Sequence, residues 1–242
     1  SQTHLLKIDS VSAGNGKIGL TFCPGKKQSD SYSGPWDRDL STDLLAIKSW
    51  GASALVTLIE DHEFGELQVS DLGALAESIG LEWHHLPISD VSVPDATFEQ
   101  SWTYSGHRLR SLLLAGKGIV VHCKGGLGRT GTIASRLMIE LGEDAEEAIR
   151  DIRHARPGSI ETFGHENSQE DYVRHCKAIS TDTNFTDRVL GCLMGGAVGD
   201  AFGYVVEFKS LKLIIDSFGE NGITEPVFHG DKLIVSDDTQ MT

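Results

Sequence analysis

Residues 119–131 read Ile-Val-Val-His-Cys-Lys-Gly-Gly-Leu-Gly-Arg-Thr-Gly, and this stretch decides the fold. Its apolar, β-branched start is typical of a buried parallel strand. The glycines that follow are typical of a tight turn, and residues 130–141 have a helical pattern. The stretch therefore predicts a strand that runs through a cysteine and a glycine-rich turn into a helix.

The flanking segments repeat this alternation of strand and helix. Short apolar runs at 54–59 and 81–88 predict two more strands. Apolar residues at helical spacing, together with N-cap residues and terminal glycines, predict helices at 41–51, 70–80, 98–115, 143–156 and 170–178. Ser41 is the predicted N-cap of the first. The alternation predicts an α/β fold with a parallel central sheet flanked by helices, in which ligands bind at the carboxyl ends of the strands.

The length of 242 residues predicts two units. We expect the α/β domain at 1–180, a short polar linker at 181–186 and a partial all-α segment at 187–242. Residues 189–206 are nearly uncharged, but Asp200 would cost roughly 2.5–3.5 kcal/mol at the centre of a membrane helix. We therefore expect a helix packed closely against another one, through glycines that recur every four positions at Gly191, Gly195, Gly199 and Gly203.

The charge and the cysteines limit the class of protein. A formal net charge of −14 disfavours binding to nucleic acid or to an anionic membrane. No C-x-x-C pair occurs, which indicates reduced thiols and a cytoplasmic location. Residues 1–17 lack the apolar core of a signal peptide. At the other end, the chain stops directly after a motif, so we expect a truncated C-terminus. The cysteines are Cys23, Cys123, Cys176 and Cys192.

The turn after the third strand has the features of an anion site. Cys123 ends the strand and Arg129 begins the helix, so backbone N–H groups and the helix N-terminus can surround a phosphate dianion without a metal. The same positive field favours the thiolate form of Cys123, the nucleophilic form. Arg129 can hold two phosphoryl oxygens through its planar fork. The expected phosphate-binding residues between them are Lys124, Gly125, Gly126, Leu127 and Gly128.

Three other interpretations of the turn are weaker. Gly126-x-Gly128-x-x-Gly131 matches the dinucleotide fingerprint, but the acidic residue expected about 20 positions later, Asp151, lies in a helical run. A Walker-type loop fails because no Gly-Lys-Ser/Thr follows. The third interpretation is that Cys123 is merely an inert buried thiol, but the spacing of the cysteine, the glycines and the arginine would then be a coincidence.

The segment His122-Cys123-x5-Arg129-Thr130 resembles the signature of the dual-specificity and tyrosine phosphatase superfamily. Residues from about 14 to 180 look most like its kinase-associated phosphatase group. The further matches are Arg38-Asp39-Leu40, Leu86-Pro87-Ile88 and Arg156-Pro157-Gly158. The resemblance implies a phosphomonoester hydrolase that needs no cofactor and acts on a phosphorylated protein.

The resemblance also implies a two-step mechanism. Cys123 attacks phosphorus to form a cysteinyl-phosphate, and Asp90, which follows Leu86-Pro87-Ile88-Ser89, protonates the leaving oxygen. Asp95 is the alternative acid, although it also fits as the cap of a helix entering at Ala96. Such acid catalysis contributes roughly 10²–10⁴-fold in rate.

Three supporting roles follow from the same resemblance. Thr130 matches the hydroxyl that assists breakdown of the thiophosphate, and His122 matches the residue that orders the loop behind the cysteine. Gln169 matches a residue that positions the hydrolytic water, or it is simply a surface glutamine on a helix.

The substrate is not determined by these residues. Lys124 resembles a lysine of phosphoinositide phosphatases, but the loop has no further basic residue before Arg129. A phosphoinositide or other non-protein phosphatase therefore stays an alternative, as does a non-catalytic phosphate-binding module. The choice between phosphotyrosine and phosphoserine or phosphothreonine, and the oligomeric state, are left open.

The second segment resembles another family. Gly191-Cys192-Leu193-x-Gly195-x-Ala197-x-Gly199-Asp200 and the later acidic tract are similar to the opening of ADP-ribosylglycohydrolases. The resemblance implies that Ser236, Asp237 and Asp238 are ligands of Mg²⁺, a cation that prefers oxygen. Mg²⁺ is expected only for a complete glycohydrolase domain. The family's later acidic motif is not among residues 187–242, so we expect no glycohydrolase activity from them.

Overall fold

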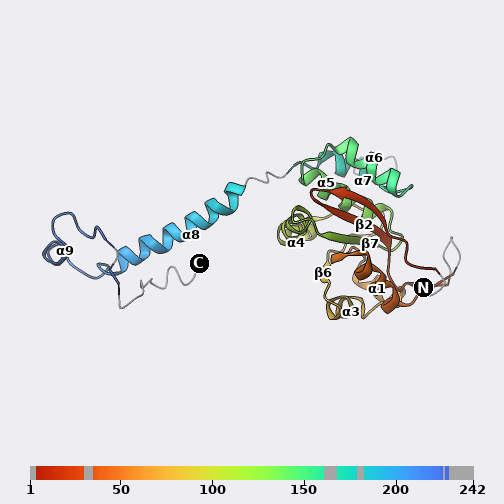
Figure 1. The fold of residues 1–242 in the computed structure, drawn as a ribbon, viewed down its shortest axis with the longest axis horizontal. Coiled ribbons are helices and arrows are strands. Elements are labelled where there is room, and N and C mark those ends of the chain that lie inside the picture. The colour runs from red at the N-terminus through yellow and green to blue at the C-terminus, as the bar shows by residue number, and fades with distance from the viewer. Residues whose placement is uncertain (1–3, 30–34, 161–167, 179–182, 226, 229–242) are drawn as a thin grey trace. The chain divides into compact units, whose positions relative to one another are not determined.

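The structure is a computed structural model that describes residues 4–29, 35–160, 168–178, 183–225 and 227–228 (Figure 1). The chain separates into two units, Ser1–Ser180 and Thr181–Thr242. The predicted metal ligands Ser236, Asp237 and Asp238 lie outside the described residues.

A five-stranded sheet with the order β1-β2-β7-β5-β6 forms the centre of the first unit. Its strands are parallel except β1, which runs antiparallel to β2. The α/β fold predicted from the alternation of elements is thus confirmed. The strand bounds are β1 Asp9–Ala13, β2 Gly16–Phe22, β5 Ala52–Thr57, β6 Glu82–His85 and β7 Gly118–Cys123.

The sequence analysis assigned no secondary structure to the segment that forms the hairpin of β1 and β2. Gly14 makes the turn at a φ of +56°, a conformation that glycine adopts without strain. A Cβ at Gly16 would lie only 2.2 Å from the carbonyl oxygen of Lys117. The two glycines therefore build the hairpin and bring β2 close to β7.

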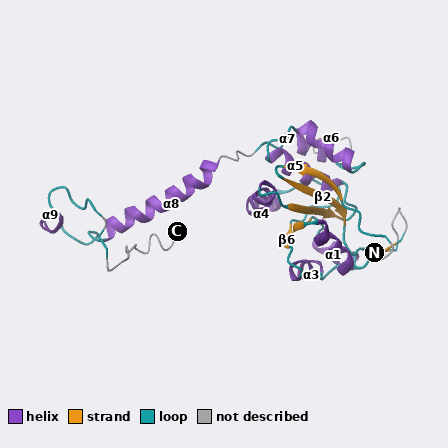
Figure 2. Cartoon of the chain, viewed as in Figure 1, coloured by secondary structure: helices purple, strands orange, loops and turns teal. Residues whose placement is uncertain are grey.

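Helices cover both faces of the sheet (Figure 2). Successive side chains of a strand point to opposite faces, and accordingly Val121 packs with one layer and Val120 with the other. The first layer contains α4 Ala96–Leu114, α5 Gly128–Glu140, α6 Ala145–Ala155 and α7 Gln169–His175. The second contains α1 Leu40–Trp50, α2 Asp61–Glu66 and α3 Leu72–Ser78.

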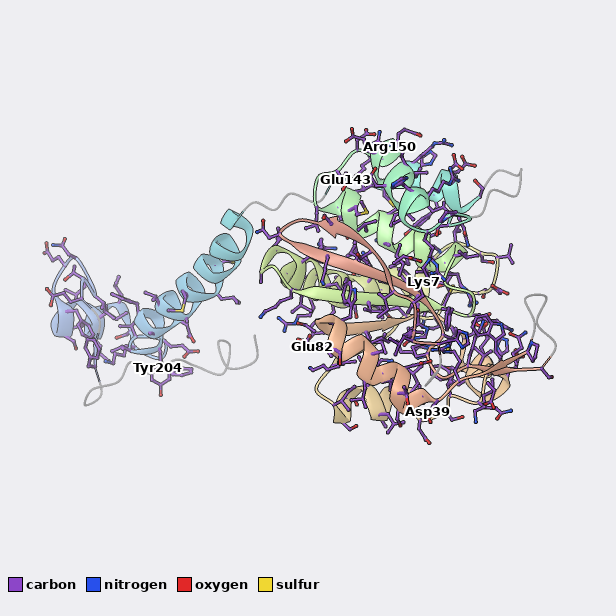
Figure 3. The ribbon with its side chains drawn as sticks, turned by 45° about the vertical axis from the view of Figure 1, so that its right-hand side comes forward. Lys7, Asp39, Glu82, Glu143, Arg150 and Tyr204 are labelled. Carbon is purple, nitrogen blue, oxygen red and sulfur yellow. The ribbon has the colours of Figure 1, made fainter. Side chains whose placement is uncertain are left out.

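The start of α1 corrects one prediction. Asp39, not Ser41, is the N-cap: its backbone is extended and its carboxylate accepts a hydrogen bond from Thr42 N at 2.7 Å. Ser41 already lies inside the helix. The predicted stop at Gly51 is confirmed, because Gly51 has a φ of +100°. Exposed charged side chains such as those of Asp39 and Arg150 lie on the outside of the unit (Figure 3).

The second unit is helical, with α8 Thr183–Tyr204 and α9 Leu211–Phe218. Helix α8 begins inside the segment 181–186 that was expected to be a linker, since residues 183–186 contain neither proline nor glycine. A Cβ at Gly195, Gly199 or Gly203 would meet no atom within 4 Å, so the expected close packing is not found among the described residues. None of the described helices has the length and apolar character that a membrane span requires.

Candidate active site

The candidate nucleophile lies where β7 ends. Cys123 is 4% exposed, and its Sγ accepts a hydrogen bond from the backbone N of Gly126 at 3.2 Å. The sulfur therefore faces the loop of residues 123–129, which we call the phosphate loop. Helix α5 begins at Gly128, so the first turn of a buried helix closes the loop.

Two cations hold the outside of the phosphate loop. Arg156 donates to the carbonyls of Gly126 and Gly125 at 2.5 and 3.3 Å, and Lys26 Nζ donates to the carbonyl of Lys124 at 3.4 Å. In a trans peptide the N–H points away from the preceding carbonyl, and the described chain has no cis peptide. The N–H groups that follow these three carbonyls therefore turn toward the inside of the loop, where an anion can accept from them.

Close packing constrains two glycines, Gly126 in the phosphate loop and Gly131 in the first turn of α5. Gly126 has a φ of +72°, and a Cβ there would lie 2.3 Å from the carbonyl oxygen of Thr21. A Cβ at Gly131 would lie 3.0 Å from the backbone N of Ile160. Gly125 has open space around the position of a Cβ. The first two glycines allow close packing of the loop on β2 and of α5 on residue 160.

Arg129 is held by a residue that the sequence analysis missed. Its Nη1 lies 2.6 Å from Oε2 of Glu63 and its Nη2 lies 3.1 Å from Oε1, and both side chains are 2% exposed. Nη1 also donates to the carbonyl of Ile88 at 3.0 Å. This bidentate pair fixes the plane of the guanidinium. No spacing rule connects α2 with the phosphate loop, so the only signal was an acidic residue shortly after a strand.

Electrostatics keep Glu63 ionised. Burial raises the pKa of its carboxyl, but hydrogen bonds from Arg129 and from the Glu60 backbone, together with the charges of Arg129 and Lys124, outweigh burial and lower it. The carboxylate is therefore charged at neutral pH and balances the buried guanidinium.

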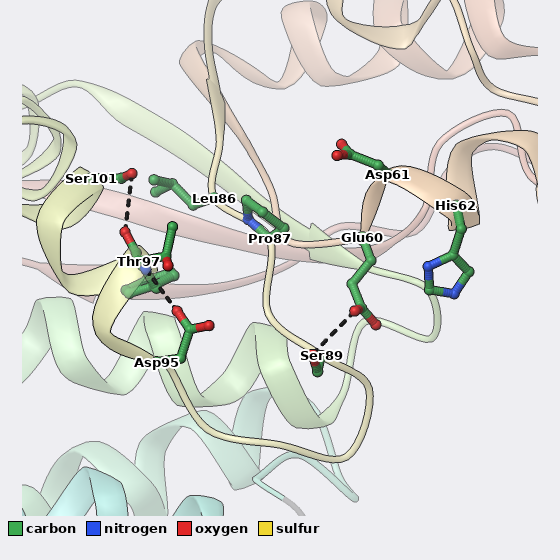
Figure 4. A pocket seen from close by; sticks show the side chains of 10 residues that line it. Glu60, Asp61, His62, Leu86, Pro87, Ser89, Asp95, Thr97 and Ser101 are labelled. Carbon is green, nitrogen blue, oxygen red and sulfur yellow. Dashed lines mark hydrogen bonds between the residues drawn. The ribbon is translucent and has the colours of Figure 1, made fainter.

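The structure brings Asp90 to the phosphate loop. Its Oδ1 lies 3.1 Å from Nη2 of Arg129, and its carboxylate is exposed. Glu60 holds the segment that carries Asp90. Its carboxylate accepts from Ser89 Oγ at 3.1 Å (Figure 4), and it also accepts from Asp90 N at 3.2 Å. Val91 follows with a φ of +57°, a strained conformation for a β-branched residue.

Asp95 serves as a helix cap. Its Oδ1 accepts a hydrogen bond from Phe98 N at 2.8 Å at the start of α4. It lines a cavity of about 430 Å³ beside Glu60 and Pro87 (Figure 4). Neither Cys123 nor Arg129 lines that cavity, so the hollow and the candidate nucleophile are separate features.

His122 is completely buried and belongs to a chain of hydrogen bonds. Trp83 Nε1 donates to Thr57 Oγ1 at 2.9 Å, and Thr57 Oγ1 lies 2.8 Å from His122 Nε2. A carbonyl oxygen only accepts, so Nδ1, which lies 3.5 Å from the carbonyl oxygen of Cys123, carries the ring proton, and Nε2 accepts from the hydroxyl of Thr57. Burial, the largest cause, lowers the pKa of His122 to about 3, so the ring is neutral.

Two other predicted residues lie nearby. Thr130 is fully buried in the first turn of α5, and its Oγ1 has no hydrogen-bond partner among the described residues. Gln169 is 3% exposed and donates to the carbonyl of Ser92 at 3.2 Å, next to the segment that carries Asp90. The interpretation of Gln169 as a surface glutamine is therefore wrong. The catalytic roles of both residues stay predictions.

The position of Asp90 leads to a prediction. Asp90 is predicted to give the leaving oxygen its proton, and Asp90→Asn removes that proton, so we expect kcat for an aryl phosphate to fall about 10²–10⁴-fold. Asp95→Asn is the matched control: it removes the same charge, and asparagine caps a helix as well as aspartate. Steady-state kinetics of both variants decide the assignment. A large loss in Asp95→Asn with normal turnover in Asp90→Asn would reverse it.

Comparisons with known proteins agree with this geometry. Residues 33–143 match the family model "Polymorphic toxin system, DSP-PTPase phosphatase", and residues 181–242 match the model "ADP-ribosylglycohydrolase". Cyclin-dependent kinase inhibitor 3 of Homo sapiens is 29% identical over 151 residues, which cover 60% of this chain and 66% of that protein. The chain thus spans just under two thirds of that relative.

A second relative and a solved structure extend the likeness. Protein tyrosine phosphatase type IVA 3 of Mus musculus is 30% identical over 132 residues, which cover 52% of this chain and 68% of that protein. The crystal structure of kinase associated phosphatase, with its catalytic-site cysteine changed to serine, matches with a TM-score of 0.61 at 25% identity and covers 77% of this chain and 97% of that one. The chain belongs to the dual-specificity and tyrosine phosphatase superfamily of cysteine-based phosphatases, with an ADP-ribosylglycohydrolase segment at its C-terminal side.

Proposed function

We propose that the chain is a phosphoprotein phosphatase of the tyrosine or dual-specificity type that works through a cysteinyl-phosphate intermediate. One observation carries the proposal: Cys123 ends β7 with its Sγ accepting from Gly126 N, and Arg129, which completes the same loop, contacts Asp90 at 3.1 Å. Family membership supports cysteine-based chemistry, and the names of the kinase-related relatives support a protein substrate.

The mechanism follows from the positions of these groups. The thiolate of Cys123 forms a bond to phosphorus while the bond to the leaving oxygen breaks, and Asp90 gives that oxygen its proton. Water then attacks the cysteinyl-phosphate, Asp90 takes up a proton of the water, and the sulfur leaves as thiolate. Arg129 holds two equatorial oxygens in both steps, because Glu63 fixes the plane of its guanidinium from the opposite side.

The pairing of Lys124 favours a protein over a phosphoinositide. Its Nζ lies 3.3 Å from Glu66 Oε2 and 4.0 Å from Glu63 Oε1. These carboxylates balance the charge that would attract a second phosphate of a lipid headgroup. The net charge of −14 acts in the same direction against an anionic membrane surface. We also propose a cytoplasmic location, which the four free cysteines support.

Hydrolysis of a chromogenic aryl phosphate with and without a chelator tests the class of reaction. We expect turnover that survives chelation, since the thiolate mechanism uses no metal. Absence of turnover with measurable phosphopeptide binding would instead indicate a phosphate-binding module. A panel of phosphotyrosine, phosphoserine and phosphothreonine peptides with soluble phosphoinositides then tests the substrate class, and faster turnover of the lipids would overturn the choice of a protein substrate.

A further inference from the structure

The phosphate loop lies on a buried lysine that the mechanism above does not use. Lys26 is 5% exposed, and its Nζ donates to the carbonyl of Lys124 at 3.4 Å. Its ammonium lies 4.0 Å from the ring centroid of Trp36 and 5.4 Å from that of Phe22. No carboxylate lies within ion-pair distance of this ammonium in the part of the chain that the structure describes. Burial of a charged ammonium costs free energy unless neighbouring groups pair with it or accept hydrogen bonds from it.

The local sequence forces Lys26 into this place. The carbonyl of Cys23 accepts from Lys26 N at 3.4 Å across Pro24 and Gly25, and Gly25 has a φ of +71°. Proline followed by a residue of positive φ is the pattern of a type II turn. A Cβ at Gly25 would lie 2.5 Å from Cβ of Leu40, so glycine is required there.

A buried ion pair locks the turn. Asp43 accepts from Gly25 N at 2.9 Å and from Arg38 Nε at 2.7 Å, and Arg38 N donates to the carbonyl of Lys26 at 3.2 Å. The short strands β3 Lys27–Gln28 and β4 Trp36–Asp37 pair beside it and bring Trp36 over the ammonium. The backbone of Lys26 is therefore held at both sides, and its side chain has little freedom to reach water.

The charge of Lys26 and the thiolate of Cys123 influence each other. Burial lowers the pKa of Lys26, and the nearby thiols Cys23 and Cys123 act in the opposite direction. Burial raises the pKa of Cys23 far above its ordinary value, so Cys23 stays protonated. Since a charge interaction is mutual, an ammonium at Lys26 favours the thiolate at Cys123. The other charged groups around these two side chains are Lys124, Arg156, Arg129, Glu63 and Asp90.

We propose that Lys26 is a positioning residue whose buried ammonium holds the carbonyl of Lys124 away from the anion site and stabilises the thiolate of Cys123. The inference rests on the proposed phosphatase function, because it assigns Lys26 to the same site. In the proposed mechanism Arg129 holds the phosphoryl oxygens, whereas Lys26 acts on the nucleophile through its contact with the carbonyl of Lys124.

Lys26→Met tests the proposal. Cys123 alkylation by iodoacetamide is followed against pH by peptide mass mapping, which separates Cys123 from the exposed Cys192. We expect the midpoint pH of alkylation to rise by about one unit, and the acid limb of kcat/KM for an aryl phosphate to move with it. Lys27→Met is the matched control: it removes the same charge from a neighbouring, half-exposed lysine paired with Asp37 at 3.7 Å, and we expect no shift.

The unfolding midpoint of Lys26→Met distinguishes the proposed role of Lys26 from a purely structural role. A methionine at position 26 removes a buried charge that lacks a carboxylate, so we expect an unfolding midpoint no lower than that of the wild type. A folded Lys26→Met with an unchanged alkylation midpoint, or an equal shift in Lys27→Met, would overturn the proposal. If Lys26→Met does not fold, Trp36→Leu removes the ring that confines the ammonium and is expected to raise the same midpoint; no change there would also overturn it.

The alkylation measurement needs no turnover. If the wild type hydrolyses no phosphoester but Lys26→Met still shifts the midpoint, the proposed function fails and the role of Lys26 in stabilising the thiolate stands. If turnover is present and the midpoint does not move, the proposed function stands and the role of Lys26 fails.

Discussion

Cys123→Ser is expected to lower kcat for an aryl phosphate by about 10⁴-fold or more while binding of a phosphopeptide is retained. A serine hydroxyl is a far weaker nucleophile than a thiolate at neutral pH, and removal of an enzyme nucleophile has effects of this order. Binding persists because the inward N–H groups and Arg129 are unchanged. Stopped-time assays give kcat, and calorimetry with a phosphotyrosine peptide gives Kd.

The control for this variant is Cys192→Ser, which changes an exposed cysteine in the other unit and is expected to leave kcat and Kd unchanged. Turnover in Cys123→Ser above about one hundredth of the wild type would show that another group attacks phosphorus. Cys123 would then not be the nucleophile, and the cysteinyl-phosphate mechanism would be wrong.

Glu63→Ala is expected to destabilise the phosphatase unit by about 3–5 kcal/mol. It leaves the guanidinium of Arg129 buried, with the exposed Asp90 as its one remaining ion-pair partner among the described residues. All four tryptophans lie within residues 1–180, so tryptophan fluorescence during urea unfolding reports this unit. Glu66→Gln is the matched control on the same helix. Its exposed pair with Lys124 contributes only about 0–1 kcal/mol.

The pH dependence of the same variant has a definite sign. The pKa of Glu63 is lower in the folded state than its ordinary value of 4.5. Its contribution to stability is therefore complete above about pH 4.5 and is lost as the pH falls through the folded-state pKa. We expect the wild type to lose stability on acidification more steeply than Glu63→Ala. Parallel curves for the two proteins would contradict the pairing.

Glu63 illustrates what the sequence could not reveal, because it pairs with Arg129 although the two residues lie 66 positions apart. Glu63 and Lys26 lie in segments that no spacing rule connects to the phosphate loop, and only the packing of α2 and of the Pro24-Gly25 turn brings them there. The resemblance favoured Asp90 over Asp95 as the acid, and the tertiary structure shows how the surroundings of the two residues differ. Both lie on one short segment, but tertiary contacts of Glu60 direct the first toward Arg129, while the second caps α4.

The N-terminal hairpin shows a similar limit. Among the described strands, β1 pairs with β2 alone, and β2 itself pairs with β7, about 100 residues away along the chain. Pairing over such separations leaves little trace in local periodicity. The glycines that allow it resemble loop residues when read alone.

The strand, the turn and the helix around Cys123 and Arg129 were determined by the sequence itself, because neighbouring residues in one continuous stretch build them through local backbone geometry. The α/β class followed in the same way from the alternation of apolar runs. Which side chains surround the sulfur and the guanidinium was decided only by the tertiary structure, since charges from distant segments gather there when the sheet and its two helix layers pack together.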